Sequence, residues 1–272
     1  MADLVLPAGL LGVFAALLGL VGGSFANVCI HRWPDGGAVS NPRRSRCPEC
    51  HAHIWGRDNV PVISWILLRG HCRDCGAPIS VRYPVVEIVM AAAFVATTVV
   101  WGPSPALPAM LVLVWALVVA SAIDLRWQII PNVLTLRLPL VLLPLVVFAA
   151  VVAGTPTRLG AVAAYGLGVP LAMVVFSEVF RLVRGQAGIG MGDVKLVVSI
   201  AMVTGLLGGW FVVVFAYASV LIAVAVALGL LLAGRARLAT RIPFGPYLAA
   251  GALCSLLVGP RLQAWIGPAF GF

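Results

Sequence analysis

The sequence predicts an all-α polytopic membrane protein with about eight transmembrane helices and one polar loop domain between the first and the second. Of the 272 residues, 62% are hydrophobic and only 10% are charged, far from the composition of a soluble globular domain. Long apolar runs recur along the chain, and several reach the ~20 residues that a helix needs to cross a bilayer. In a soluble protein the net charge of +9 would indicate nucleic acid binding. Here the charges concentrate in a few loops, so we expect a lipid bilayer and no nucleic acid as partner.

Eight apolar runs are the candidate spans. The first lacks a basic segment before it and is too long for a signal peptide, so we expect it to remain as a span. Its glycines, Gly12, Gly19, Gly22 and Gly23 among them, allow a neighbouring helix to approach closely. The sixth and eighth runs are short for a bilayer. The eight runs cover residues 4–28, 84–101, 106–123, 133–153, 159–180, 194–208, 210–232 and 246–258.

Basic residues between the runs predict the orientation, because lysine and arginine concentrate in cytoplasmic loops. An N-terminus outside the cell places 16 of the 18 basic residues inside and only Arg158 and Arg261 outside. In a bacterium this side is the cytoplasm, so we expect a multi-pass membrane protein with residues 31–83 in the cytoplasm. Four of the inside residues are Arg43, Arg44, Arg237 and Arg241.

Residues 31–83 contain two Cys-x-x-Cys pairs separated by 21 residues. Each pair can supply two thiolates from one tight turn, and two such turns form the tetrahedral sulfur site that zinc favours. Two disulfides are the alternative, but thiols stay reduced in the cytoplasm. Four cysteines complete the coordination, which indicates a structural metal. The predicted ligands are Cys47, Cys50, Cys72 and Cys75. The neighbouring histidines that could replace a ligand are His51, His53 and His71.

The rest of this loop is mildly basic, which favours anionic lipid headgroups or an anionic ligand over a basic peptide. Its apolar stretch Val60–Leu68 is too short to span a bilayer. We expect that stretch to lie at the membrane interface or to pack against the cysteine pairs.

Carboxylates beside apolar helices are costly and are therefore candidates for function. For Glu178 an ion pair with Arg181, three residues later, is a sufficient explanation. Glu87, at the inner end of the second run, has no cation near it except Arg82 and the arginines of the loop, and it is a candidate for lining a functional cleft.

Asp124 and Asp193 are the strongest candidates, because the predicted topology places both at the inner membrane face. Each has a simpler explanation. Asp124 could pair with Arg126, and Asp193 could stabilise a helix N-terminus or pair with Lys195. Those explanations do not account for the glycines before Asp193, which invite close approach by another backbone. These glycines are Gly188, Gly190 and Gly192. Later, Ile242-Pro243-Phe244-Gly245-Pro246 predicts a rigid turn that opens the last span.

Several motifs together resemble the prepilin peptidases, the type IV leader peptidases, over almost the whole chain. The Gly-x-Gly-Asp-x-Lys motif is the most specific of them. The matching stretches are Gly23-Ser24-Phe25-Ala26-Asn27-Val28, the two cysteine pairs, Asp124 with Arg126 and Pro131-Asn132, Gly190 to Lys195, and Pro243-Phe244-Gly245-Pro246. Ala26 and Met191 depart from the residues that are common in the family.

The resemblance implies a two-step enzyme of the bacterial inner membrane that serves type IV pilus assembly or type II secretion. Such enzymes cleave the leader of prepilins and pseudopilins after a glycine, then methylate the new N-terminal amine with S-adenosylmethionine. By the resemblance, Asp124 and Asp193 are the catalytic pair of a GxGD-type aspartyl protease, supported by Gly190, Gly192 and Lys195. In such a pair one carboxylate takes a proton from water and the other donates to the scissile carbonyl.

The cysteine loop favours the form with both activities, since family members without it tend to be peptidases only. The residues that bind S-adenosylmethionine are unknown from the sequence, and Glu87 is the candidate near the reacting groups. The chain then divides into a first span (1–30), a cysteine-rich loop domain associated with methyl transfer (31–83) and a membrane peptidase core (84–272). The alternatives are a peptidase without methylation, or a membrane carrier or scaffold that is no enzyme.

Overall fold

The computed structural model describes residues 8–41, 45–185, 188–235 and 242–270. Over these ranges the chain is helical, and its only extended pairings are isolated β-bridges within the loop between the first two long helices. The prediction of an all-α fold is therefore confirmed. Arg43, Arg44, Arg237 and Arg241, which contribute to the predicted orientation, lie outside the described residues.

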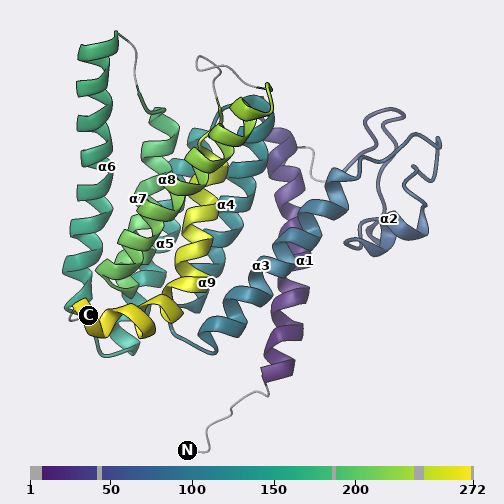
Figure 1. The fold of residues 1–272 in the computed structure, drawn as a ribbon. Helices are drawn as coiled ribbons and strands as arrows, with labels where there is room; N and C mark the ends of the chain where they lie inside the picture. Colours follow the sequence, from purple (N-terminus) through teal and green to yellow (C-terminus); the bar gives the residue numbers. More distant parts are fainter. Residues whose placement is uncertain (1–7, 42–44, 186–187, 236–241, 271–272) are drawn as a thin grey trace, which may run out of the picture. The chain divides into compact units, whose positions relative to one another are not determined.

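The chain forms two compact units, Met1–Pro103 and Ser104–Phe272. The first contains α1 (Ala8–Arg32), a short 3-10 helix η1 (Gly56–Asp58), α2 (Ile63–Leu67) and α3 (Arg82–Trp101). The second contains α4 (Leu107–Trp127), α5 (Asn132–Val152), α6 (Arg158–Arg184), α7 (Met191–Leu207), α8 (Gly209–Leu232) and α9 (Gly245–Phe270). Figure 1 labels these helices along the ribbon.

In the first unit α1 packs along α3 at two glycines. A Cβ atom on Gly19 would lie 2.5 Å from the Cα of Ala91, and one on Gly23 would lie 2.6 Å from the Cα of Glu87. Only residues without a side chain permit backbones this close, as in other membrane helix pairs. The predicted close approach along the first run is confirmed at Gly19 and Gly23.

In the second unit α7 is the central helix, because α4, α5, α6, α8 and α9 all contact it. Its side chains from Leu196 to Leu206 are nearly all buried. The motif around Asp193 lies at the N-terminal end of this packed helix, where Asp193 is half-buried.

Six of the described helices are long and apolar enough to cross a membrane, namely α1, α3, α4, α5, α6 and α8. The remaining two predicted spans correspond to α7, which has 17 residues, and α9. Large apolar side chains project outward from α5, α6 and α8, for example Leu140 and Leu167, each 71% exposed. A lipid-facing surface has this character, so the fold is that of a multi-pass membrane protein.

Candidate functional site

The second unit brings Asp124 and Asp193 together. Asp124 lies in the last turn of α4 and is 5% exposed, and Asp193 lies in the first turn of α7. The two carboxylates are close enough to interact electrostatically. Residues 69 positions apart in the sequence thus form one acidic pair at the ends of two packed helices.

Asp124 has a backbone partner rather than a cationic one. The N–H of Gly245, the first residue of α9, donates to Oδ2 of Asp124 over 2.8 Å. Among the described residues no ion pair joins Asp124 to Arg126, whose guanidinium instead lies 4.7 Å from the ring centre of Trp127. The simple helix-end ion pair is therefore not the interaction that holds this carboxylate.

The glycines before Asp193 leave room for neighbouring groups of the same unit. Gly190 is extended, and a Cβ atom on it would lie 2.8 Å from Oδ2 of Asp193. A Cβ atom on Gly192 would lie 3.1 Å from the Cβ of Ile130, in the connection between α4 and α5. A side chain at Gly190 would displace the Asp193 carboxylate, and one at Gly192 would require Ile130 to move by a few tenths of an ångström.

Lys195 pairs with Asn132. Its Nζ donates to Oδ1 of Asn132 over 2.8 Å, which ties the first turn of α7 to the start of α5. Within the described part of the chain, no ion pair joins Lys195 to Asp193. Lys195 thus joins α7 to α5 beside the acidic pair, and its contribution to catalysis stays a prediction.

Ser177 of α6 holds the segment that precedes α7. This contact was not predicted from the sequence. The Oγ of Ser177 accepts the N–H of Ile189 over 3.2 Å and donates to the carbonyl oxygen of Ile189 over 3.4 Å. A single serine in an apolar helix does not indicate in the sequence that it makes such a contact. The predicted ion pair next to it is confirmed, since Arg181 lies 2.6 Å from Glu178.

The four predicted cysteines of the first unit form one cluster. Their sulfur atoms all lie within 4.8 Å of one another, and those of Cys47 and Cys75 are 3.8 Å apart. A tetrahedral zinc site with Zn–S bonds of about 2.3 Å places its sulfurs about 3.8 Å apart. All four are free thiols, so the disulfide alternative is not seen, and the arrangement fits zinc.

The two cysteine turns have the same backbone pattern. Cys47 N–H donates to the carbonyl of Ala52, and Cys72 N–H donates to that of Ala77, over 3.0 and 2.8 Å. The backbone N–H of Cys50 lowers the pKa of the Cys47 thiol to about 7, and the thiolate is the form that binds a metal. The backbone therefore gives the two turns the same conformation, and it favours the thiolate at Cys47.

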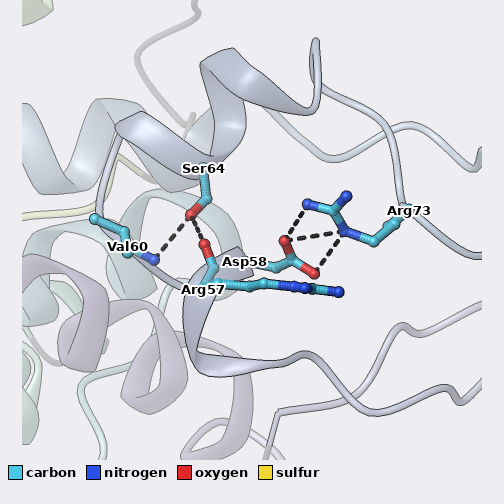
Figure 2. Close-up of polar contacts among 5 residues, drawn as sticks. All are labelled: Arg57, Asp58, Val60, Ser64 and Arg73. Atoms are coloured by element: carbon cyan, nitrogen blue, oxygen red, sulfur yellow. Dashed lines mark hydrogen bonds and ion pairs between the residues drawn. The ribbon is translucent and has the colours of Figure 1, made fainter.

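A polar network links the segment between the two turns (Figure 2). Ser64 accepts the N–H of Val60 and donates to the carbonyl of Arg57, both over 2.9 Å. Arg73 makes a 2.6 Å ion pair with Asp58, and its hydrogen bonds lower the pKa of that carboxyl. Arg73 lies between Cys72 and Cys75, so this pair fastens the second turn to η1.

Part of the apolar stretch Val60–Leu68 packs on the second cysteine turn, which confirms one of the two expectations for it. The indole Nε1 of Trp65 donates to the carbonyl of Ile79 over 3.0 Å, and its ring lies against Gly70. Ile63, Ile66 and Leu67 of α2 remain exposed.

Glu87 is buried, with 7% of its surface exposed, and it holds this segment from α3. Its Oε2 accepts the N–H of Val62 over 2.8 Å, and the side chain of Ser24 in α1 also hydrogen-bonds to it. One helix turn away, the side-chain amide of Asn27 donates to the carbonyl of Tyr83 over 3.0 Å. Ser24 and Asn27 of the first-span motif thus connect α1 to the start of α3.

Curated relatives cover nearly the whole chain. A protein of Burkholderia pseudomallei named prepilin leader peptidase/N-methyltransferase is 35% identical over 96% of this chain and 90% of its own length. The proteins of the same name from Aeromonas hydrophila and Stutzerimonas stutzeri are 35% and 37% identical, each over 92% of this chain and 91% of their own. Residues 111–232 match the type IV leader peptidase family.

This chain belongs to the type IV leader peptidase family.

The family match maps onto the two units of the structure. Residues 17–101, which match the bacterial peptidase A24 N-terminal domain, include the four cysteines and Glu87. The leader peptidase match at 111–232 includes Asp124 and Asp193. Gly245 lies beyond the residues that either family description matches, although it contacts Asp124 directly. No solved structure matches the chain.

Proposed function

We propose that this protein cleaves the leader peptide of type IV prepilins or pseudopilins after a glycine, and then methylates the new N-terminal amine with S-adenosylmethionine. The acidic pair of Asp124 and Asp193 is the observation that carries the cleavage step. The names of relatives at about 35% identity support both activities.

For peptide cleavage the pair acts as a unit that shares one proton. One carboxylate takes a proton from water as the water attacks the scissile carbonyl. The other donates a proton to the carbonyl oxygen, so no covalent acyl-enzyme forms. Lys195 ties α7 to α5 beside Asp193 through its hydrogen bond to Asn132, and Gly190 and Gly192 leave room for the Asp193 carboxylate and for Ile130.

For methyl transfer the main demand is the position of the amine against the sulfonium methyl. We place this reaction in the first unit, between the cysteine-rich loop and α3, with Glu87 near the reacting groups. Zinc bound by Cys47, Cys50, Cys72 and Cys75 stabilises the loop as a closed structural site.

We assign the reaction to the cytoplasmic face of the bacterial inner membrane, with the N-terminus outside the cell. The distribution of basic residues along the sequence supports this orientation.

The decisive experiment incubates the purified protein with a prepilin, with and without S-adenosylmethionine, and determines the product masses. Asp124→Asn and Asp193→Asn should each lower cleavage by about 10²- to 10⁴-fold, the usual contribution of a general acid or base. Glu178→Gln, which removes an exposed carboxylate of the same unit, should cleave normally. Cleavage that continues unchanged in both asparagine variants would refute the role of the acidic pair, and an unaltered protein that cleaves no prepilin would leave the carrier or scaffold function. A cleaved product without an added methyl group would indicate a peptidase that does not methylate its product.

A further inference from the structure

The turn before α9 contributes a backbone group to the acidic pair. Gly245 is buried, and its N–H donates to Oδ2 of Asp124 over 2.8 Å in a contact that spans 121 positions of sequence. Oδ2 of Asp124 therefore accepts a backbone hydrogen bond, and both oxygens of the carboxylate keep further lone pairs for Asp193 and a water molecule.

Position 245 requires glycine because of Asp124 and not because of its own backbone. A Cβ atom on Gly245 would lie 2.8 Å from Oδ2 of Asp124 and 3.3 Å from its Cβ and Cγ atoms. Contacts under 3.0 Å force a neighbouring group to move. The φ angle of Gly245 is outside the left-handed region, so an alanine would fit the backbone there. The group that would have to move is the carboxylate.

The contact also places Asp124 at the N-terminus of a helix. The first N–H groups of a helix have no acceptor within it, and the helix dipole favours negative charge there. Asp124 lies in the last turn of its own helix, where the dipole is unfavourable. The N-terminus of α9 supplies the compensating field, as the N-terminus of α7 does for Asp193.

The turn is held independently of Asp124. Pro243 and Pro246 restrict the backbone on both sides of Gly245. The N–H groups of Tyr247 and Leu248 donate to the carbonyl of Phe244 over 3.0 and 3.1 Å. The Gly245 amide is thus presented from a rigid element, which is what a positioning group needs.

We propose that Gly245 is a positioning residue for peptide cleavage, and that its backbone N–H orients the Asp124 carboxylate toward Asp193 and the attacking water. This inference rests on the proposed peptidase function.

Gly245→Ala tests it, with Gly229→Ala as the matched control, since a Cβ atom on Gly229 in α8 would meet nothing within 4 Å. We measure kcat and KM for prepilin cleavage, and separately the methylation of a pilin peptide supplied without its leader. We expect Gly245→Ala to lower kcat about 100-fold, the cost of a 1 Å misplacement at a reacting group. Its KM and its methylation rate should stay close to those of the unaltered protein, and Gly229→Ala should match that protein in all three.

Each other outcome overturns the inference. Unchanged kcat would show that the contact does not orient Asp124. A rise in KM alone would make Gly245 a substrate contact, and a joint loss of cleavage and methylation would make it a folding position. Failure of the unaltered protein to cleave prepilin would instead contradict the proposed function itself, so the two failures are distinguishable.

Discussion

Val62, between the two cysteine pairs, has a backbone conformation that valine rarely adopts. Its φ of 62° and ψ of −49°, with Ile63 N–H donating to the carbonyl of Pro61 over 2.6 Å, describe a strained γ-turn. A β-branched residue with positive φ costs on the order of 1–3 kcal/mol unless its surroundings hold it. Glu87 holds it, because its carboxylate accepts the Val62 N–H. Strain of this kind often marks a functional site.

Two substitutions of Glu87 distinguish a structural role, in which it holds the Val62 turn, from a role in methyl transfer. Glu87→Gln keeps an oxygen for the Val62 N–H but removes the charge, whereas Glu87→Ala removes both. If the charge serves methyl transfer, Glu87→Gln should lower methylation about 10²-fold or more, the scale of a lost charged catalytic group, with cleavage unchanged. Mass analysis of processed pilin measures both steps. Full methylation by Glu87→Gln, with loss only in Glu87→Ala, would restrict Glu87 to holding the turn.

At the scale of elements, each unit is organised around one close packing of helices. In the first unit, the glycines of α1 allow the backbone of α3, which carries Glu87, to approach closely. In the second, α7 is surrounded by five helices and carries Asp193 at its N-terminus. Glu87 and Asp193 therefore lie on closely packed helices, and Asp124 lies on α4, which contacts α5, α7 and α9.

The packing of α1 on α3 predicts different effects for the same substitution at two positions of one helix. Gly19→Ala places a methyl group 2.5 Å from the Cα of Ala91, so the helices must separate. We expect a loss of about 1–3 kcal/mol in the free energy of unfolding, typical of overpacking. Gly12→Ala meets nothing within 4 Å and should gain up to about 1 kcal/mol from helix propensity. Equal unfolding temperatures in detergent would contradict this packing.

At the scale of the whole molecule, the cysteine cluster and the acidic pair belong to different compact units. Each unit has its own internal contacts, and one family match falls within each. The two proposed reactions are thus assigned to separate structural bodies. Perturbation of one body is expected to act first on its own reaction.

Zinc removal should therefore affect methylation more than cleavage. We expect a chelator, or Cys72→Ser with Cys75→Ser, to remove the bound metal, destabilise the first unit and lower methylation at least about tenfold, since structural zinc contributes directly to folding. Cys254, which lies outside the cluster, provides the control. The Cys254→Ser protein should keep its bound metal and both activities. Metal content, unfolding temperature and product masses are the measurements. A first unit that stays intact and active without metal would refute a structural role for zinc.

Much of this arrangement was predictable because it depends on local patterns. Apolar runs predicted the helices, since a membrane helix must satisfy its own backbone hydrogen bonds. The repeated spacing of Cys47, Cys50, Cys72 and Cys75 predicted one cluster, which is confirmed. Three predictions remain untested: the catalytic role of Asp124 and Asp193, the division of the chain into domains and the orientation of the protein in the membrane.

By itself, then, the sequence determined the all-helical membrane fold, and it identified the four cysteines as candidate metal ligands and the two aspartates as candidate catalytic residues. Only the tertiary structure decided what each carboxylate contacts. Gly245 donates to Asp124, Asn132 accepts from Lys195, and Val62 donates to Glu87. The physical reason is that spacing and composition specify elements one at a time. A hydrogen bond between residues as distant in sequence as Asp124 and Gly245 depends on how packed helices direct their ends toward one another.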